Sequence, residues 1–207
     1  MNKNLFISFP LVFFSAASVL ADEVFLDFEG LADSAEISDF YNGGTDSEGA
    51  SGTDYGVAFG SSLIAKIDSD SGGTGNFANE PSPDTILVLG AAETLIDVES
   101  GFDTRVSFRY SSSTSVLVEA WSKLGGTGEV LASLSFSSNY NDNSCVGDPE
   151  GVFCNWSLFS MSIPSEVQSI KFTATTAGAS GIDDLQFADV KPARRSSIIK
   201  LLPLILE

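Results

Sequence analysis

Short runs in which apolar and polar residues alternate recur between residues 24 and 187, and clusters of Gly, Ser, Asn and Asp separate them. Alternation with a period of two is typical of β-strands, and such clusters are typical of turns. No window longer than ten residues shows helical periodicity. The pattern predicts eleven strands: Val24–Glu29, Val57–Phe59, Leu63–Asp68, Thr85–Leu89, Leu95–Val98, Thr104–Tyr110, Ser115–Lys123, Val130–Phe136, Trp156–Ile163, Ser169–Thr175 and Ile182–Phe187.

This succession of short strands and polar turns favours an all-β fold. We expect a single domain over residues 22–190, built as an antiparallel β-sandwich of jelly-roll type. The glycine-rich segment Leu124–Glu129 lies between two predicted strands and is interpreted as a hairpin loop.

Residues 1–21 have the pattern of a secretory signal peptide. Lys3 precedes the largely apolar stretch Leu5–Leu20, and Val19-Leu20-Ala21 offers small residues at the cleavage positions. The alternative is a membrane anchor, but the stretch is shorter than the roughly 20 residues that a span needs. We therefore expect a secreted or cell-envelope protein.

The last residues differ in composition from the domain. Residues 191–207 contain Lys191, Arg194, Arg195 and Lys200, followed by a short apolar run. Two interpretations stay open: a segment that contacts a membrane surface, or a poorly ordered tail.

The charge of the chain excludes several function classes. Asp and Glu number 28 against 10 Lys and Arg, which gives a net charge of −18, and there is no His. Nucleic acid is therefore not an expected partner, because phosphate binding needs clustered basic residues. The absence of His excludes Ser-His-Asp and Cys-His catalytic systems and the usual zinc sites.

The two cysteines, Cys145 and Cys154, flank a Gly-Asp-Pro-Glu-Gly turn. In an exported protein, such a pair is most simply a disulfide. The alternative, a redox-active dithiol, lacks the Cys-x-x-Cys spacing that would support it.

Three segments carry a family resemblance. They are Phe25-Leu26-Asp27-Phe28-Glu29-Gly30-Leu31 with Phe40-Tyr41-Asn42-Gly43-Gly44, the stretch Asp68–Thr85, and Gly181-Ile182-Asp183-Asp184-Leu185-Gln186-Phe187. In this order, and with the Gly-Thr-Gly hairpin, they resemble secreted bacterial proteins of the PEP-CTERM class, which exosortase systems sort to the envelope. The resemblance implies a fold and a location. The sorting tail of that class is missing here: there is no Pro-Glu-Pro, and the basic residues precede the apolar run. This difference favours simple release.

The acidic residues near both ends of the domain suggest calcium. Asp27 and Glu29 are two residues apart in a predicted strand, so both would point to one face. The chain is also similar to jelly-roll carbohydrate-binding modules, in which the first and last strands lie side by side. That similarity implies a structural calcium held by Asp27, Glu29 and Asp183, with Asp184 next, since calcium takes several carboxylate oxygens. The alternative is that these side chains face solvent separately.

A candidate ligand site lies in the segment from residue 76 to residue 84. It combines amide and acidic side chains with one aromatic ring, a composition that suits sugar hydroxyls: Asn76, Phe77, Asn79, Glu80 and Asp84. The alternative is that the Asn and Asp side chains only close backbone turns.

Three functions are compatible with this sequence. The first is a non-catalytic module that binds extracellular polysaccharide and is stabilised by calcium. The second is a structural matrix protein without a small ligand. The third is a small glycoside hydrolase that uses a carboxylate pair. We favour the first and predict no catalytic residues, because no carboxylate pair stands out by its local context.

Overall fold

The computed structural model describes residues 22–141, 145 and 151–191. This part of the chain contains no helix, and all strand pairs are antiparallel. The nine strands are β1 (Asp22–Leu26), β2 (Val57–Phe59), β3 (Leu63–Ile67), β4 (Thr85–Leu89), β5 (Glu93–Ser112), β6 (Val116–Lys123), β7 (Thr127–Phe136), β8 (Ser157–Ala174) and β9 (Ser180–Val190). The all-β prediction is confirmed.

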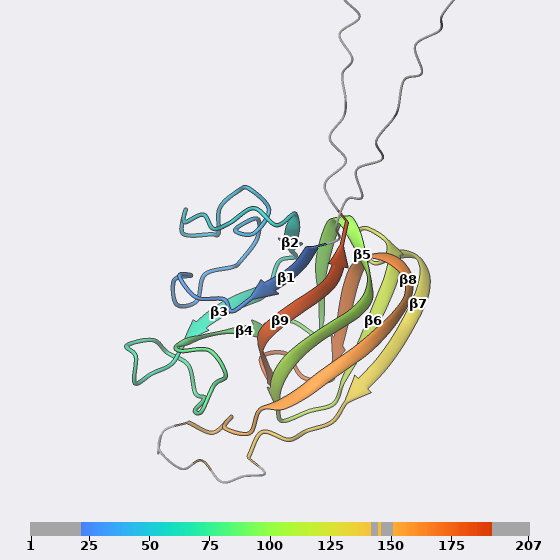
Figure 1. Cartoon of the computed structure of the whole chain (residues 1–207). Helices are drawn as coiled ribbons and strands as arrows, with labels where there is room; N and C mark the ends of the chain where they lie inside the picture. The colour runs from blue at the N-terminus through green and yellow to red at the C-terminus, as the bar shows by residue number, and fades with distance from the viewer. Residues whose placement is uncertain (1–21, 142–144, 146–150, 192–207) are drawn as a thin grey trace, which may run out of the picture.

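Two long strands, β5 and β8, belong to both layers of a sandwich (Figure 1). In one layer, the first part of β5 pairs with β2 and with the last part of β8, which in turn pairs with β6; β7 is the edge. In the other layer, the second part of β5 lies between the first part of β8 and β9. Strands β1 and β4 both pair with β9, and β3 follows β4.

These long strands correct the prediction of eleven strands. Leu95–Val98 and Thr104–Tyr110 are parts of β5, and Trp156–Ile163 and Ser169–Thr175 fall largely within β8. The register between β5 and β8 shifts twice between Asp97 and Thr104, where Gly101 has a φ of 78°. Such bulges bend a strand without ending it.

Aromatic rings fill the space between the layers. Phe108 of β5 is 1% exposed, and its ring stacks on Phe159 at a centroid distance of 4.6 Å. The rings of Phe136 and Phe172 lie 6.0 and 5.8 Å from the ring of Phe108. The core therefore joins β5, β7 and both halves of β8.

The disulfide prediction is confirmed by the Cys145–Cys154 bond. It closes a loop that leads into β8. The predicted hairpin is also present, since β6 and β7 are joined at Leu124–Gly126.

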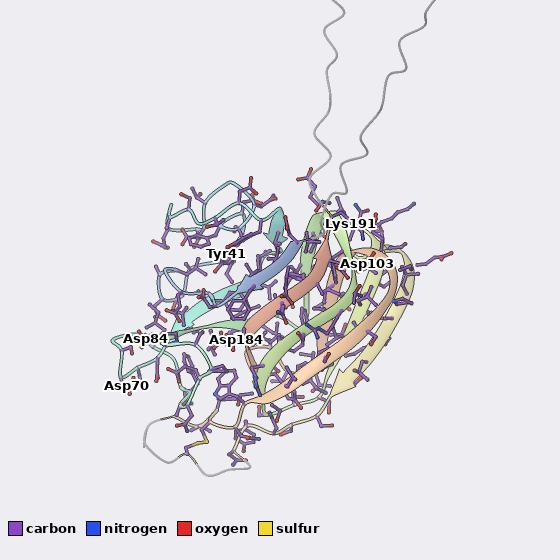
Figure 2. All side chains as sticks on the ribbon, in the orientation of Figure 1. Tyr41, Asp70, Asp84, Asp103, Asp184 and Lys191 are labelled. Carbon is purple, nitrogen blue, oxygen red and sulfur yellow. A yellow bond between two sulfur atoms is a disulfide. The ribbon has the colours of Figure 1, made fainter. Side chains whose placement is uncertain are left out.

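The two ends of the domain meet, because Asp22 of β1 pairs with Val190 of β9. Next to them, Lys191 forms an ion pair with Asp103 at 2.5 Å (Figure 2). Within the described ranges, no helix is long and apolar enough to cross a membrane. The predicted signal peptide lies outside the described residues, as does the tail after residue 191.

Candidate functional site

A bulge in β9 places two adjacent carboxylates in different surroundings. Arg109 of β5 pairs with Asp183, whereas Ser107 pairs with Gln186, so β9 has one extra residue there. Asp184 has a φ of 52° and is half-buried, while Asp183 is completely buried. The bulge therefore turns Asp183 toward the loop that precedes β4.

Asp183 holds this loop through Ser82. Its carboxylate oxygens accept hydrogen bonds from the backbone N–H of Ser82 at 2.9 Å and from the Ser82 hydroxyl at 2.7 and 2.8 Å. The N–H of Asp184 is a further donor at 2.7 Å. Burial raises the pKa of Asp183 to about 7, although the bonds from Ser82 oppose this rise.

Glu29 holds the same loop two residues further on. One of its oxygens accepts hydrogen bonds from the N–H groups of Asp84 and Thr85, at 3.0 and 2.9 Å. The backbone carbonyl of Asp27 accepts a bond from the Ser82 hydroxyl at 3.0 Å. Residues 82–85 are thus fixed from both ends of the domain.

The expectation that Asp27 and Glu29 share a strand face is wrong. β1 ends at Leu26, and Phe28 has a φ of 62°, a left-handed conformation that interrupts the strand pattern. Both acidic residues follow β1, and Glu29 reaches the 82–85 loop because the chain turns at Phe28. Asp183 and Asp184 lie in the last strand, as expected.

The calcium site receives no support from this arrangement. Asp27, Glu29 and Asp183 approach one segment of the chain, but Glu29 and Asp183 direct their oxygens to its N–H and hydroxyl donors. Within the part of the chain that the structure describes, no group of three or more acidic or cysteine side chains is placed to hold a metal ion. Calcium binding stays a prediction from the sequence.

The predicted ligand segment divides between two hollows. Asn76 and Phe77 line a cavity of about 380 Å³ between the sheet and two loops, which we call the sheet–loop cavity. Asn79, Glu80 and Asp84 line a separate hollow of about 610 Å³, which we call the acidic hollow. Its other lining residues include Asp68 and Asp70; Figure 2 labels Asp70 and Asp84 on this loop. The structure therefore does not unite the five residues in one site.

The surroundings of Glu80 in the acidic hollow oppose its ionisation. Burial raises its pKa from 4.5 to about 7, a backbone hydrogen bond opposes the rise, and Asp68, Asp70 and Asp84 add repulsion. Because the unfolded chain releases this proton near pH 4.5, Glu80 lowers the free energy of unfolding as the pH rises from there to about 7.

We therefore expect Glu80→Gln to gain stability relative to the wild type as the pH increases from 4 to 8. Urea unfolding at several pH values measures this difference. The matched control is Glu48→Gln, at an exposed loop position outside the hollow. A Glu80→Gln difference that stays constant with pH would show that the carboxyl group titrates normally.

A further polar surface, which the sequence did not single out, covers the outer face of four strands. Strand pairing places Phe25 of β1 beside Gln186 of β9, then Ser107 of β5 and Ser160 of β8. Arg105 and Arg109 lie on the same face as Ser107, since alternate residues of a strand point to one side. We call this surface the open sheet face; it consists of Glu23, Phe25, Arg105, Arg109, Leu158, Ser160, Ser162, Asp184 and Gln186, together with Ser107, which is 7% exposed and donates to Gln186.

The open sheet face carries two exposed apolar side chains at its two sides. Phe25 is 50% exposed and Leu158 is 61% exposed. The residues that alternate with them, such as Val24 and Phe159, are buried. In Figure 1 the strands β1, β9, β5 and β8 lie side by side, and no loop is drawn across them.

The charged groups of this face are arranged in opposite pairs. The Arg105 guanidinium lies 3.5 Å from Glu23 and donates to the Gln186 amide oxygen at 3.3 Å. The amide nitrogen of Gln186 donates to Glu23 at 2.5 Å. Burial raises the pKa of Asp184, which the charge of Arg109 opposes.

Alternation was the available signal for this face. In β5, Arg105, Ser107 and Arg109 alternate with apolar residues. In β8, Ser160 and Ser162 do the same, whereas Leu158 on this face is itself apolar. The pattern does not show which strands are neighbours in the sheet, because β1 and β9 pair although they are far apart in the sequence.

No protein-family model matches the chain, and no curated protein matches it. Among solved structures, the K2 cleaved adhesin domain of Lys-gingipain is similar, with 12% identity, coverage of 80% of this chain and 99% of that chain, and a TM-score of 0.49. A glycoside hydrolase family 43 arabinoxylan arabinofuranohydrolase from Bacillus subtilis has 10% identity, coverage of 62% and 24%, and a TM-score of 0.37. A family 29 carbohydrate binding module has 12% identity, coverage of 56% and 91%, and a TM-score of 0.36. Similarities of this size assign no family or activity, and the resemblance to the PEP-CTERM class stays a prediction.

Proposed function

We propose that the protein is an exported, non-catalytic module that binds neutral polysaccharide on the open sheet face. The observation that carries the proposal is the combination on this face of an exposed phenyl ring, Phe25, with a row of polar side chains that leads across three more strands. The disulfide supports export, because such bonds persist in oxidising compartments.

The side chains of the face suit sugar hydroxyl groups, which both donate and accept hydrogen bonds. Arginine only donates, ionised carboxylates only accept, and Gln and Ser do both. Phe25 adds an apolar platform for the C–H face of a sugar ring. Four strands about 4.8 Å apart span about 14 Å, which is wide enough for an extended chain ligand.

The charge balance of the face favours a neutral ligand. Glu23 and Gln186 already contact Arg105, and the carboxyl group of Asp184 interacts electrostatically with the guanidinium of Arg109. Neither guanidinium is left as an isolated positive charge for an acidic polymer, and the whole chain has a charge of −18. Repulsion from the remaining surface would therefore weaken binding of acidic polysaccharides.

The test is affinity electrophoresis and calorimetry of residues 22–191 with soluble glucans, xylans and mannans. We expect Phe25→Ala to weaken binding at least about tenfold, since loss of an aromatic contact of about 1.4 kcal/mol corresponds to that factor. The matched control is Tyr55→Ala, which removes another exposed aromatic ring, outside the open sheet face.

Equal losses for Phe25→Ala and Tyr55→Ala would overturn the assignment of the site, and a panel without any binding would overturn the function. Release of reducing sugar from a bound polysaccharide would instead place the protein among the hydrolases.

A further inference from the structure

The sheet–loop cavity lies on the opposite side of β9 from β5, over the outer face of β3 and β4. Its floor is apolar: Ile64 of β3 and Ile86 and Val88 of β4 line it, with Gly181 of β9. A Cβ atom at residue 181 would lie 2.7 Å from the Ile86 side chain, so glycine keeps this part of the floor open. At about 380 Å³, the cavity is in the size range of small-molecule sites.

Two loop segments form its wall and are fixed to one another. The N–H of Phe153 donates to the Asn76 carbonyl at 3.2 Å, and the N–H of Ala78 donates to the Phe153 carbonyl at 3.1 Å. The Trp156 indole N–H donates to the Ala78 carbonyl at 3.0 Å. The Cys145–Cys154 disulfide ends directly beside Phe153. The wall is thus built before any ligand arrives, which lowers the cost of binding.

Several polar side chains of the lining already have partners. The Asn76 amide oxygen accepts a bond from the N–H of Val152 at 3.1 Å. The Thr74 hydroxyl donates to Asp33 at 2.7 Å, and the Ser180 hydroxyl is paired with Ser112 at 2.7 Å. A sugar would need more free donors and acceptors than these groups offer, so the lining favours a ligand with an apolar body.

Lys66 is the charged exception in this lining. The residue as a whole is half-buried, and its ammonium group donates to the hydroxyls of Ser34 and Thr74, both at 2.7 Å, in exposed surroundings. An ammonium group has three donors, so one remains. None of the ion pairs within the described residues includes Lys66; the nearby carboxylate of Asp33 accepts from the same two hydroxyls and interacts with the Lys66 charge without forming an ion pair.

We propose that the sheet–loop cavity binds a small amphipathic carboxylate, with its hydrocarbon body on the floor of Ile64, Ile86 and Val88 and its carboxylate on Lys66. The charged head group would receive the third ammonium donor, and the apolar body would remove the half-buried side chains of Ile64 and Val88 from water. This site is separate from the open sheet face and does not depend on the polysaccharide function.

The experiment is a titration of 15N-labelled protein with octanoate and with 1-octanol, two probes that differ in the head group. We expect octanoate to shift the amide signals of Gly75, Gly90 and Gly181, which line the cavity, and to bind at least about fivefold more tightly than octanol. Lys66→Met keeps the length of the side chain and removes its charge; it should weaken octanoate binding about fivefold and leave octanol binding unchanged.

Val88→Phe fills the cavity and should weaken both probes. Lys123→Met removes an exposed charge elsewhere and should change neither, and Phe25→Ala should leave octanoate binding intact while it weakens polysaccharide binding. Equal binding of octanoate to the wild type and Lys66→Met, equal affinity for the two probes, or unchanged binding by folded Val88→Phe would each overturn the proposal.

Discussion

Replacement of Phe108 with alanine is expected to lower the free energy of unfolding by about 3–5 kcal/mol, the usual cost of deleting a large buried side chain. Phe108 is 1% exposed, and its ring contacts those of Phe136, Phe159 and Phe172. The variant would lose burial and leave a cavity where β5, β7 and both halves of β8 meet, so the surroundings have little freedom to collapse into it.

Urea unfolding followed by tryptophan fluorescence measures this loss, and Phe25→Ala is the matched control. Both variants remove one phenyl ring, but Phe25 is 50% exposed and should cost less than about 1 kcal/mol. If the two variants lost similar stability, Phe108 would not be the centre of the core that the structure describes.

The positions of the strands could be predicted from alternation, but their continuity could not. Leu95–Val98 and Thr104–Tyr110 both alternate and were therefore assigned correctly to strands. The residues between them break the pattern because the strand bulges near Gly101 and crosses from one layer to the other. A bulge and a turn break the alternation in the same way, so the sequence does not distinguish them. The pairing of β5 with β8 on both sides of the break identifies it as a bulge.

The approach of the acidic residues could also be predicted, but not their role. Glu29 and Asp183 were expected to meet near a common point because the first and last strands lie side by side, and β1 does pair with β9. In the structure, the backbone N–H groups of Ser82, Asp84 and Thr85 donate to these carboxylates, an arrangement that the sequence did not predict, and calcium binding stays a prediction. Which N–H groups a loop presents depends on its conformation, and residue types alone do not determine that conformation.

The ligand segment illustrates the same limit. Asn76 and Glu80 are four residues apart, but they line different hollows. Asn79, which lies between them, has a φ of 57°, a left-handed conformation that changes the direction of the chain. Residues that are close in the sequence, such as Asn76 and Glu80, therefore do not share a site. The open sheet face, by contrast, brings together residues that are far apart in the sequence.

Asp183→Ala should destabilise the fold by about 3 kcal/mol, although it removes no aromatic ring. The substitution removes the acceptor for the N–H and hydroxyl of Ser82, both of which are in buried surroundings. A buried donor that loses its acceptor costs about 1–3 kcal/mol. The 82–85 loop would then be held mainly by Glu29, through the N–H groups of Asp84 and Thr85.

Two further variants test whether the loss of stability in Asp183→Ala comes from its hydrogen bonds rather than from packing or from charge. Ser82→Ala keeps the carboxyl group of Asp183 but removes its hydroxyl donor, and should cost about 1–2 kcal/mol, since a hydrogen bond contributes about 0.5–1.5 kcal/mol and one to a charged group about 1.5–3 kcal/mol. Asp70→Ala removes an exposed carboxylate of the neighbouring loop and should stay within about 0.5 kcal/mol of the wild type. The local measurement is hydrogen exchange of the backbone amides at residues 82–85. We expect these amides to exchange faster in Asp183→Ala and Ser82→Ala than in the wild type, and at an unchanged rate in Asp70→Ala. Unchanged protection in Asp183→Ala would mean that this carboxylate does not hold the loop, and that residues 82–85 are held instead by Glu29 and the backbone carbonyl of Asp27, which follow β1.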